Sequence, residues 1–390
     1  MVDNLKDIKS KIFSFRGLVF IGSADIIGAA ISTIFWLILA SLLLVEEYGK
    51  ITYLIAIASL AQSCSVVGSS NTFMVYSSKK PELIQTLIFL SFFAAIVSSI
   101  IAFFVTQKFE LIFLVFSFLI LELSSAILLG KKFYSRYSKF ILSQKTLQFI
   151  LGIGLYFLIG FDGILIGIIL ANIPLLVILL QQLNNFKLNL SGLKTTKEFI
   201  INNYVTFLIS VFRRDIDKII IAPLLGFVIL GNFAFAIQIY TILMVVSSVS
   251  YKYLVPEDAT GKKNKQLKKI LILFSIIISV ISFVLSPILI ETVFPKFSES
   301  ILVIQIISFT IIPATIGMIL FSKILALEKS RYLILATSIQ LCVVLFGTIF
   351  LGLLFGLMGI AVSFLIAAIA HTVTLAIMNY HFIGGGKFDI

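Results

Sequence analysis

Charge, cysteine and long polar segments are all scarce in this sequence. Only 12% of the 390 residues are charged, against about 25% in ordinary globular domains. The two cysteines, Cys64 and Cys342, lie far apart inside apolar runs. We interpret them as small hydrophobic residues rather than as a disulfide or a metal-binding pair. Because no polar segment is long enough to bury a core of its own, the sequence excludes an ordinary soluble protein.

The motifs of nucleotide sites, metal sites and hydrolases are absent as well. The sequence contains no G-x-x-x-x-G-K-(S/T) loop, no H-E-x-x-H run, no cluster of Cys and His, and no G-x-S-x-G elbow. The connections on the predicted outer side are also too short for the carboxylate-bearing external loop of a membrane glycosyltransferase. We therefore expect no cofactor, no metal and no enzymatic activity.

Hydrophobic residues, by contrast, make up 60% of the chain and give it a mean hydropathy of +1.15. A transmembrane helix needs roughly 20 predominantly apolar residues, and runs of this kind recur along the whole sequence. They predict an all-α, polytopic membrane protein with about twelve transmembrane helices. The predicted spans lie near residues 17–45, 51–76, 83–105, 110–130, 140–160, 163–183, 199–224, 228–250, 270–291, 300–321, 332–352 and 358–382.

Most of the 30 basic residues fall in alternate connections between these spans. The segment 252–269 is the richest in lysine, whereas the opposite connections carry only Lys50, Lys108 and Lys296. Cytoplasmic loops of membrane proteins have such an excess of Lys and Arg. The pattern predicts a cell-membrane protein with both termini in the cytoplasm. The location of the basic residues in cytoplasmic connections also explains the net charge of +12. We therefore expect membrane lipids and no nucleic acid as partners.

The two halves of the sequence resemble each other. Each half holds six predicted spans, an even number, so the halves should have the same orientation in the membrane. Parallel repeats of this kind occur in transporter folds whose substrate site lies between the repeats. We predict two parallel six-helix bundles, residues 1–190 and 191–390. At an offset of 192 residues, the matching pairs include Lys131 with Lys323, Ser138 with Ser330, Gln148 with Gln340 and Gly160 with Gly352; after a slip of four residues, Gly160 and Gly163 also match Gly356 and Gly359.

The seventh predicted span, residues 199–224, carries five charged residues near its middle. Each would cost about 2.5–3.5 kcal/mol at the centre of a bilayer, so the five cannot face lipid. At 100° per residue, most of the polar residues share one face that could line a wet cavity. Asp217 is expected to pair with Arg213 and Arg214 when no substrate is bound. The face comprises Asn203, Thr206, Ser210, Arg213, Arg214, Asp217 and Lys218, and it leaves out Asp215.

Three cations and two anions in a water-shielded site suit an anionic head group. Arginine can hold a phosphate or carboxylate through two parallel hydrogen bonds. A phosphate about 4 Å from one cation gains on the order of 4 kcal/mol at an effective dielectric constant near 20, before desolvation is subtracted. The alternative is an ion-pair network that only holds helices together. We predict a substrate-binding site made of Arg213, Arg214, Lys218, Asp217, Asn203 and Ser210.

Two further carboxylates lie inside predicted spans. Asp25 is in the first span, beside small residues that permit close helix approach, and Glu122 is near the middle of the fourth. Intramembrane carboxylates are costly, so both are candidates for binding a coupling ion, Na⁺ or H⁺. For His371, in the twelfth span, a packing role is the favoured interpretation.

Several short segments resemble the polysaccharide-biosynthesis (O-antigen-type) flippases, which belong to the multidrug/oligosaccharidyl-lipid/polysaccharide exporter superfamily. The resemblance implies a monomeric transporter that moves a lipid-linked oligosaccharide by alternating access of two six-helix bundles. It also implies that basic residues engage the phosphate of the lipid carrier, and Arg213, Arg214 and Lys218 occupy fitting positions. The segments are DKIIIAPLLG (217–226), GNFAFA (231–236), LLVEEYG (43–49) and GLMGIA (356–361).

Other functions remain open at this point. A cation-coupled exporter of small molecules could use the same fold, with Asp25 or Glu122 binding the ion. Major-facilitator transporters also have six plus six spans, but their acidic-basic signature is missing from the second connection, SSKKPEL (77–83). A membrane enzyme acting on lipid-linked sugars is disfavoured by the short external loops. A purely structural subunit is the last alternative.

Overall fold

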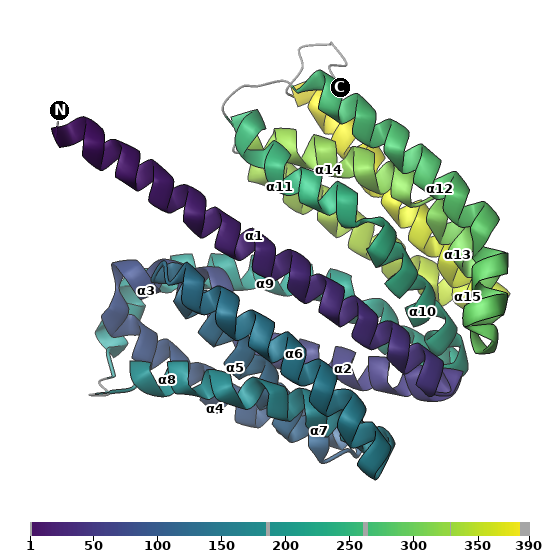
Figure 1. Ribbon diagram of the computed structural model, residues 1–390, viewed down its shortest axis with the longest axis horizontal. Helices are drawn as coiled ribbons and strands as arrows, with labels where there is room; N and C mark the ends of the chain where they lie inside the picture. Colours follow the sequence, from purple (N-terminus) through teal and green to yellow (C-terminus); the bar gives the residue numbers. More distant parts are fainter. Residues whose placement is uncertain (1, 185–187, 260–263, 328, 383–390) are drawn as a thin grey trace. The chain divides into compact units, whose positions relative to one another are not determined.

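The computed structural model describes residues 2–184, 188–259, 264–327 and 329–382, and within these ranges the chain is helical with short connections and no strand (Figure 1). This confirms the predicted all-α fold. The helices are α1 (Val2–Leu42), α2 (Val45–Ser65), α3 (Ser70–Lys79), α4 (Pro81–Thr106), α5 (Glu110–Gly130), α6 (Tyr134–Ile159), α7 (Phe161–Asn172), α8 (Leu176–Gln182), α9 (Leu190–Leu225), α10 (Phe227–Leu243), α11 (Val245–Ala259), α12 (Lys265–Val293), α13 (Ser300–Ser308), α14 (Ile311–Ala326) and α15 (Ser330–Phe382), with 3₁₀ turns at Ile173–Leu175 and Pro295–Phe297.

Eight helical segments among the described residues are long and apolar enough to cross a membrane, or up to ten if two bent helix pairs each count as one span. The bent pairs are α2 with α3 and α10 with α11. Helix α9 is not among the ten because of its charges, and α15 counts once although its backbone breaks at Gly356. A crossing by α9 and two crossings by α15 would raise ten to twelve. The chain is a multi-pass membrane protein, and the count of twelve remains a prediction.

The chain forms two compact units. Met1–Leu39 and Leu54–Val211 make unit 1, whereas Ala40–Tyr53 and Phe212–Ile390 make unit 2. Helices α2 and α9 therefore each contribute to both units. The predicted bundles differ from these units in the segments 40–53 and 191–211, and the bundles themselves remain a prediction.

Helix α5 lies at the centre of unit 1. It packs against α3, α4, α6 and α7, and its apolar side chains, including Leu111, Leu114, Leu119 and Leu123, are fully buried. Pro174 lies in the 3₁₀ turn between α7 and α8, where it removes a backbone donor. Ser124 Oγ of α5 donates to the carbonyl of Leu175 in the same turn over 3.0 Å. A side chain of α5 is thus bonded to the backbone at this break.

In unit 2, α14 packs against α11, α12 and α15. A second contact region joins the start of α2 to α10. There the ring of Phe297 stacks on Phe235 with a centroid separation of 4.3 Å, and Tyr48 meets Phe297 edge-on at 5.5 Å. Gly49 lies directly against the backbone of Phe227. The junction between the first two spans, predicted from the LLVEEYG segment, is thus a closely packed part of unit 2.

A glycine-dependent break lies at a corresponding position in each unit. Gly160 ends α6 with φ = 75°, and Gly356 interrupts α15 with φ = 57°. L-residues with side chains rarely adopt this left-handed region, whereas glycine enters it without steric cost. These two glycines are a pair matched in the sequence comparison of the two halves.

Another matched pair brings helices into close approach just after each break. A methyl group on Gly163 would overlap the backbone carbonyl of Leu155, and one on Gly359 would overlap the carbonyl of Leu351. The sequence repeat therefore corresponds to a repeated structural device, a tight helical hairpin in each unit.

Replacement of Gly359 by alanine is expected to destabilise the protein by about 1–3 kcal/mol, because overpacking against a rigid backbone carbonyl forces the two segments of α15 apart. Thermal unfolding of the detergent-purified chain would measure the loss. Gly154→Ala is the matched control, since an added methyl group there meets nothing within 4 Å and alanine favours helix. Equal melting temperatures for the two variants would contradict the close approach.

Candidate functional site: the polar face of α9

The polar residues of α9 belong to both units, because the first part of this helix lies in unit 1 and the second part in unit 2. Asn203 and Ser210 lie in the part that belongs to unit 1. Asn203 Nδ2 donates to the carbonyl of Phe199 over 2.8 Å, and Ser210 Oγ donates to the carbonyl of Thr206 over 3.0 Å. Both side chains thus donate a hydrogen bond within their own helix.

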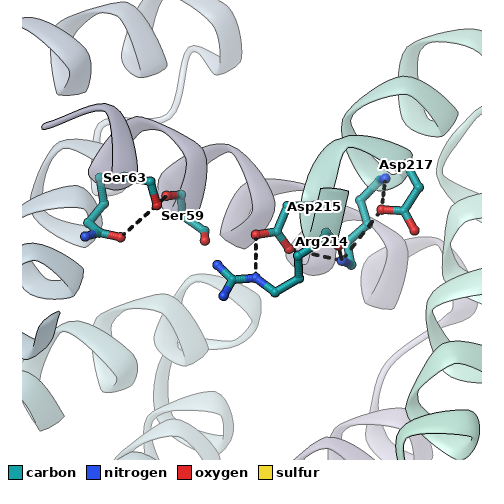
Figure 2. Close-up of polar contacts among 7 residues, drawn as sticks. Ser59, Ser63, Arg214, Asp215 and Asp217 are labelled. Carbon is teal, nitrogen blue, oxygen red and sulfur yellow. Dashed lines mark hydrogen bonds and ion pairs between the residues drawn. The ribbon is translucent and has the colours of Figure 1, made fainter. Parts of the chain in front are cut away.

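The charged residues of α9 lie in unit 2 and form a compact ion-pair cluster (Figure 2). Asp215 accepts from Arg214 Nε over 3.0 Å and from Lys218 Nζ over 3.1 Å. Lys218 Nζ also lies 3.8 Å from Asp217 Oδ1 and donates to the carbonyl of Arg214 over 2.9 Å. The two carboxylates are buried, and they hold the ammonium of Lys218 between them.

These pairs differ from the expected ones. Helical periodicity predicts that Asp217 pairs with Arg213 and Arg214 and that Asp215 lies outside the polar face. The structure instead makes Asp215 the acceptor for two cations. The physical reason is that the helical angle locates only the Cβ atom, whereas arginine and lysine have long, flexible side chains whose charged ends reach around the helix.

Arg213 takes part in a second set of contacts in unit 2. Its Nη1 donates to Oε1 of Gln340 in α15 over 3.2 Å. Tyr240 of α10 and His371 of α15 lie within electrostatic range of the same guanidinium. The ring of His371 also packs against Phe321 at a centroid distance of 6.4 Å. Gln340 is one of the residues matched between the two halves, and its role here was not predicted.

The three cations therefore have different environments. The Lys218 side chain is 17% exposed and is compensated by two carboxylates, whereas the Arg214 side chain is 63% exposed. Arg213 is exposed as well. A guanidinium has five N–H donors in a planar fork that matches a phosphate or carboxylate. The two arginines suit anion binding, and Lys218 suits the role of a structural ion-pair partner.

A second polar cluster lies in unit 1 and contains both predicted ion-coupling residues. Tyr137 Oη of α6 donates to Asp25 Oδ1 of α1 over 3.1 Å. Ser70 Oγ of α3 donates to Glu122 Oε1 of α5, and Tyr137 is within electrostatic range of both carboxylates. Four helices thus supply oxygen atoms to one region. Sequence analysis did not identify Tyr137 or Ser70, because no local pattern links residues on separate helices.

Metal binding was not expected from the sequence. Within the described part of the chain, no group of three or more His, Cys, Asp or Glu residues is arranged to hold a metal ion. The cluster in unit 1 has two carboxylates with hydroxyl groups, a ligand set of hard oxygen atoms that suits a proton or an alkali cation better than a transition metal.

The fold is that of membrane transporters and flippases of the MOP superfamily. No protein-family model and no curated protein sequence matches the chain, but solved structures do. Lipid II flippase MurJ, in an inward closed conformation, is 14% identical with a TM-score of 0.73, covering 92% of this chain and 87% of that chain. An inward-facing multidrug resistance MATE family transporter of the MOP superfamily is 13% identical with a TM-score of 0.64, covering 89% and 92%.

A third similar structure is a MOP superfamily transporter from Pyrococcus furiosus, described as having reverse polarity of its binding pocket. It is 13% identical with a TM-score of 0.59, and the match covers 92% of this chain and 94% of that chain. These similar structures are transporters and flippases rather than enzymes. At such identities the likeness establishes the fold, and function has to be argued from the residues of this chain.

Proposed function

We propose that this protein is a flippase that moves a lipid-linked oligosaccharide or polysaccharide precursor across the cell membrane. In this proposal the chain acts as a monomer with both termini in the cytoplasm, and its two halves alternate access to the two sides. The observation that carries the proposal is the pair of exposed arginines, Arg213 and Arg214, on the charged helix α9 of a chain with the MOP fold. The O-antigen-type family is the finer assignment within it.

The chemistry of a lipid-linked glycan matches these two residues. Its phosphate is anionic and bears oxygen atoms at the spacing of a guanidinium fork. Arginine remains charged at any physiological pH, and intramembrane cations mark substrate pathways because they are otherwise too costly to keep. We place the phosphate at Arg213 and Arg214. The polar residues Asn203 and Ser210 precede the arginines on the same helix, and their side-chain oxygen atoms can accept from sugar hydroxyl groups, while Asp217 and Lys218 maintain the local structure.

The test is translocation of a fluorescent lipid-linked diphospho-oligosaccharide in liposomes that contain the purified chain. Wild-type protein is expected to move the lipid to the opposite leaflet faster than protein-free liposomes do. A lipid with the same tail and glycan but without phosphate should not be moved. Equal rates for the two lipids would contradict a phosphate-based mechanism, and no movement of either would remove the flippase proposal.

The polar cluster of unit 1 supports a second proposal, that transport is coupled to Na⁺ or H⁺. Asp25, Glu122 and Tyr137 bring two carboxylates and a phenol into one region, which could bind a cation whose release drives the transport cycle. The same cluster would serve a cation-coupled exporter of small molecules on this fold.

Asp25→Asn combined with Glu122→Gln is expected to abolish the dependence of transport on an imposed Na⁺ or H⁺ gradient, because both acceptor charges are lost. The measurement compares initial rates with and without each gradient in liposomes. Glu110→Gln, at the start of α5, is the matched control for loss of a carboxylate. Unchanged gradient dependence in the double variant would show that the cluster has no coupling role.

A further inference from the structure

A small cationic cavity lies in unit 1, separate from both clusters described above. It has a volume of about 210 Å³ and is formed by the end of α5, the start of α6 and the end of α8. Sites that enclose a drug-sized molecule usually measure roughly 300–1,000 Å³, so this cavity fits a head group rather than a whole ligand. The lining residues are Ile127, Leu128, Lys131, Phe133, Arg136, Phe140, Val177, Ile178, Gln181 and Gln182.

The polar part of this cavity is built for an anion. Lys131 and Arg136 are its two charged residues, and Gln181 and Gln182 add amide groups; none of the lining side chains is acidic. The guanidinium of Arg136 lies over the ring of Phe133 at 5.4 Å. This cation–π contact holds the guanidinium beside the cavity, and arginine has five N–H donors that can bind phosphate oxygen atoms.

Lys131 is held in place by the surrounding structure. Its Nζ donates to Oε1 of Gln182, and Gln85 Nε2 of α4 donates to the backbone carbonyl of Gln182 over 2.8 Å. Burial lowers the pKa of Lys131, because an ammonium loses solvation in a cavity. A bound anion would offset this loss of solvation. The cation is therefore positioned before any ligand arrives.

The other residues that line the cavity are apolar, and some of them are exposed on the protein surface. Phe133 and Val177 are 46% and 51% exposed, although both are hydrophobic, and Leu180 on the same short helix is 55% exposed. Exposed hydrophobic side chains on a membrane protein contact acyl chains. The cavity thus joins a cationic end to a lipid-facing apolar side, which is the polarity of a phospholipid molecule.

We propose that this cavity binds the phosphate head group of an anionic phospholipid, with the acyl chains lying along Phe133 and Val177. The connection between α5 and α6 is on the side predicted to be cytoplasmic, where anionic lipids concentrate and where basic pockets between helices bind lipid head groups. The site is independent of the proposed transport path on α9. Its occupancy would anchor α8 to the α5–α6 connection.

Native mass spectrometry of the detergent-purified full chain with added phosphatidylglycerol tests the proposal. Wild-type protein is expected to retain one phosphatidylglycerol at least about a hundredfold more tightly than Lys131→Gln/Arg136→Gln, since each of the two lost bonds is a charge-assisted hydrogen bond to phosphate. The matched control, Lys132→Gln/Lys139→Gln, removes the same charge from exposed lysines outside the cavity. It should bind like wild type.

Two competition measurements use the wild-type chain alone, so they do not depend on the folding of a variant. Phosphatidylcholine, whose head group has no net charge, should compete about tenfold less well than phosphatidylglycerol. Excess glycerol 3-phosphate should not displace the bound lipid, because it lacks acyl chains. Equal affinity for the two lipids, equal losses in the cavity and control variants, or full displacement by glycerol 3-phosphate would each overturn the proposal, the last by identifying a site for free anions.

Discussion

Replacement of both Arg213 and Arg214 by glutamine is expected to lower the translocation rate of a lipid-linked oligosaccharide by at least about a hundredfold. A charge-assisted hydrogen bond contributes about 1.5–3 kcal/mol, so the loss of two such donors to a phosphate corresponds to two or more factors of ten. Glutamine retains a polar but shorter side chain, and Lys218 keeps its bonds to Asp215 and Asp217. The liposome assay described above gives the rate, and thermal unfolding shows whether the variant is intact.

Two comparison variants distinguish the roles of charge and geometry. Arg213→Lys with Arg214→Lys keeps both charges but lacks the planar fork, so we expect an intermediate rate. Arg331→Gln removes an exposed arginine at the start of α15 and should leave the rate unchanged. If the glutamine pair transports as well as wild type, then the arginines only stabilise the helix packing, and the binding role assigned to them is wrong.

Asp258→Asn is expected to destabilise unit 2 by about 3–5 kcal/mol, the usual cost of leaving a buried charge without its partner. Lys268 Nζ of α12 lies 2.8 Å from Asp258 Oδ1 of α11, and the side chains of lysine and aspartate are only 7% and 5% exposed. Ser322 of α14 donates to the other carboxylate oxygen over 2.8 Å. One aspartate therefore links three helices, and its neutral form cannot balance the buried ammonium.

The loss should appear as a lower melting temperature and a smaller monodisperse fraction in size-exclusion chromatography. Lys269→Gln, next in sequence but exposed, is the control and should behave like wild type. Replacement of both partners by apolar residues, as in Asp258→Leu/Lys268→Met, should recover much of the stability, because no uncompensated charge remains. A double variant as unstable as Asp258→Asn would show that the pair is needed for reasons other than charge balance.

The fold was predictable because it depends on composition and periodicity. Long apolar runs identify helices that lipid requires to be internally hydrogen-bonded, and the matched glycines at Gly160 and Gly356 mark the same backbone break in each unit. Such a break can be recognised from the sequence because its backbone conformation favours glycine. The charged helix α9 was recognisable because charged residues are costly, and therefore rare, in a predicted transmembrane segment.

The contacts within the candidate sites were only partly predictable. Asp25 and Glu122 could be selected singly, but Tyr137, which donates to Asp25 and lies within electrostatic range of Glu122, becomes relevant only when α1, α5 and α6 are placed together. Asp215 was left out of the predicted polar face because a helical angle does not take account of the length of the arginine and lysine side chains that reach it. The cavity around Lys131 likewise depends on how α8 meets the α5–α6 connection. Such contacts depend on tertiary packing, on which local sequence patterns carry little information.

The ion pairs of α9 also bear on how the protein is made. This helix carries eight charged residues, five of them between Arg213 and Lys218, and no part of it is apolar and uncharged enough to count as a span by itself. A segment of this kind should insert poorly into the bilayer before the helices that follow it have been synthesised. With Lys218 already paired to Asp215 and Asp217, the cluster would enter the lipid with far less charge than its sequence suggests. We therefore expect membrane integration of α9 to wait for later helices, such as α10, that can shelter this paired surface.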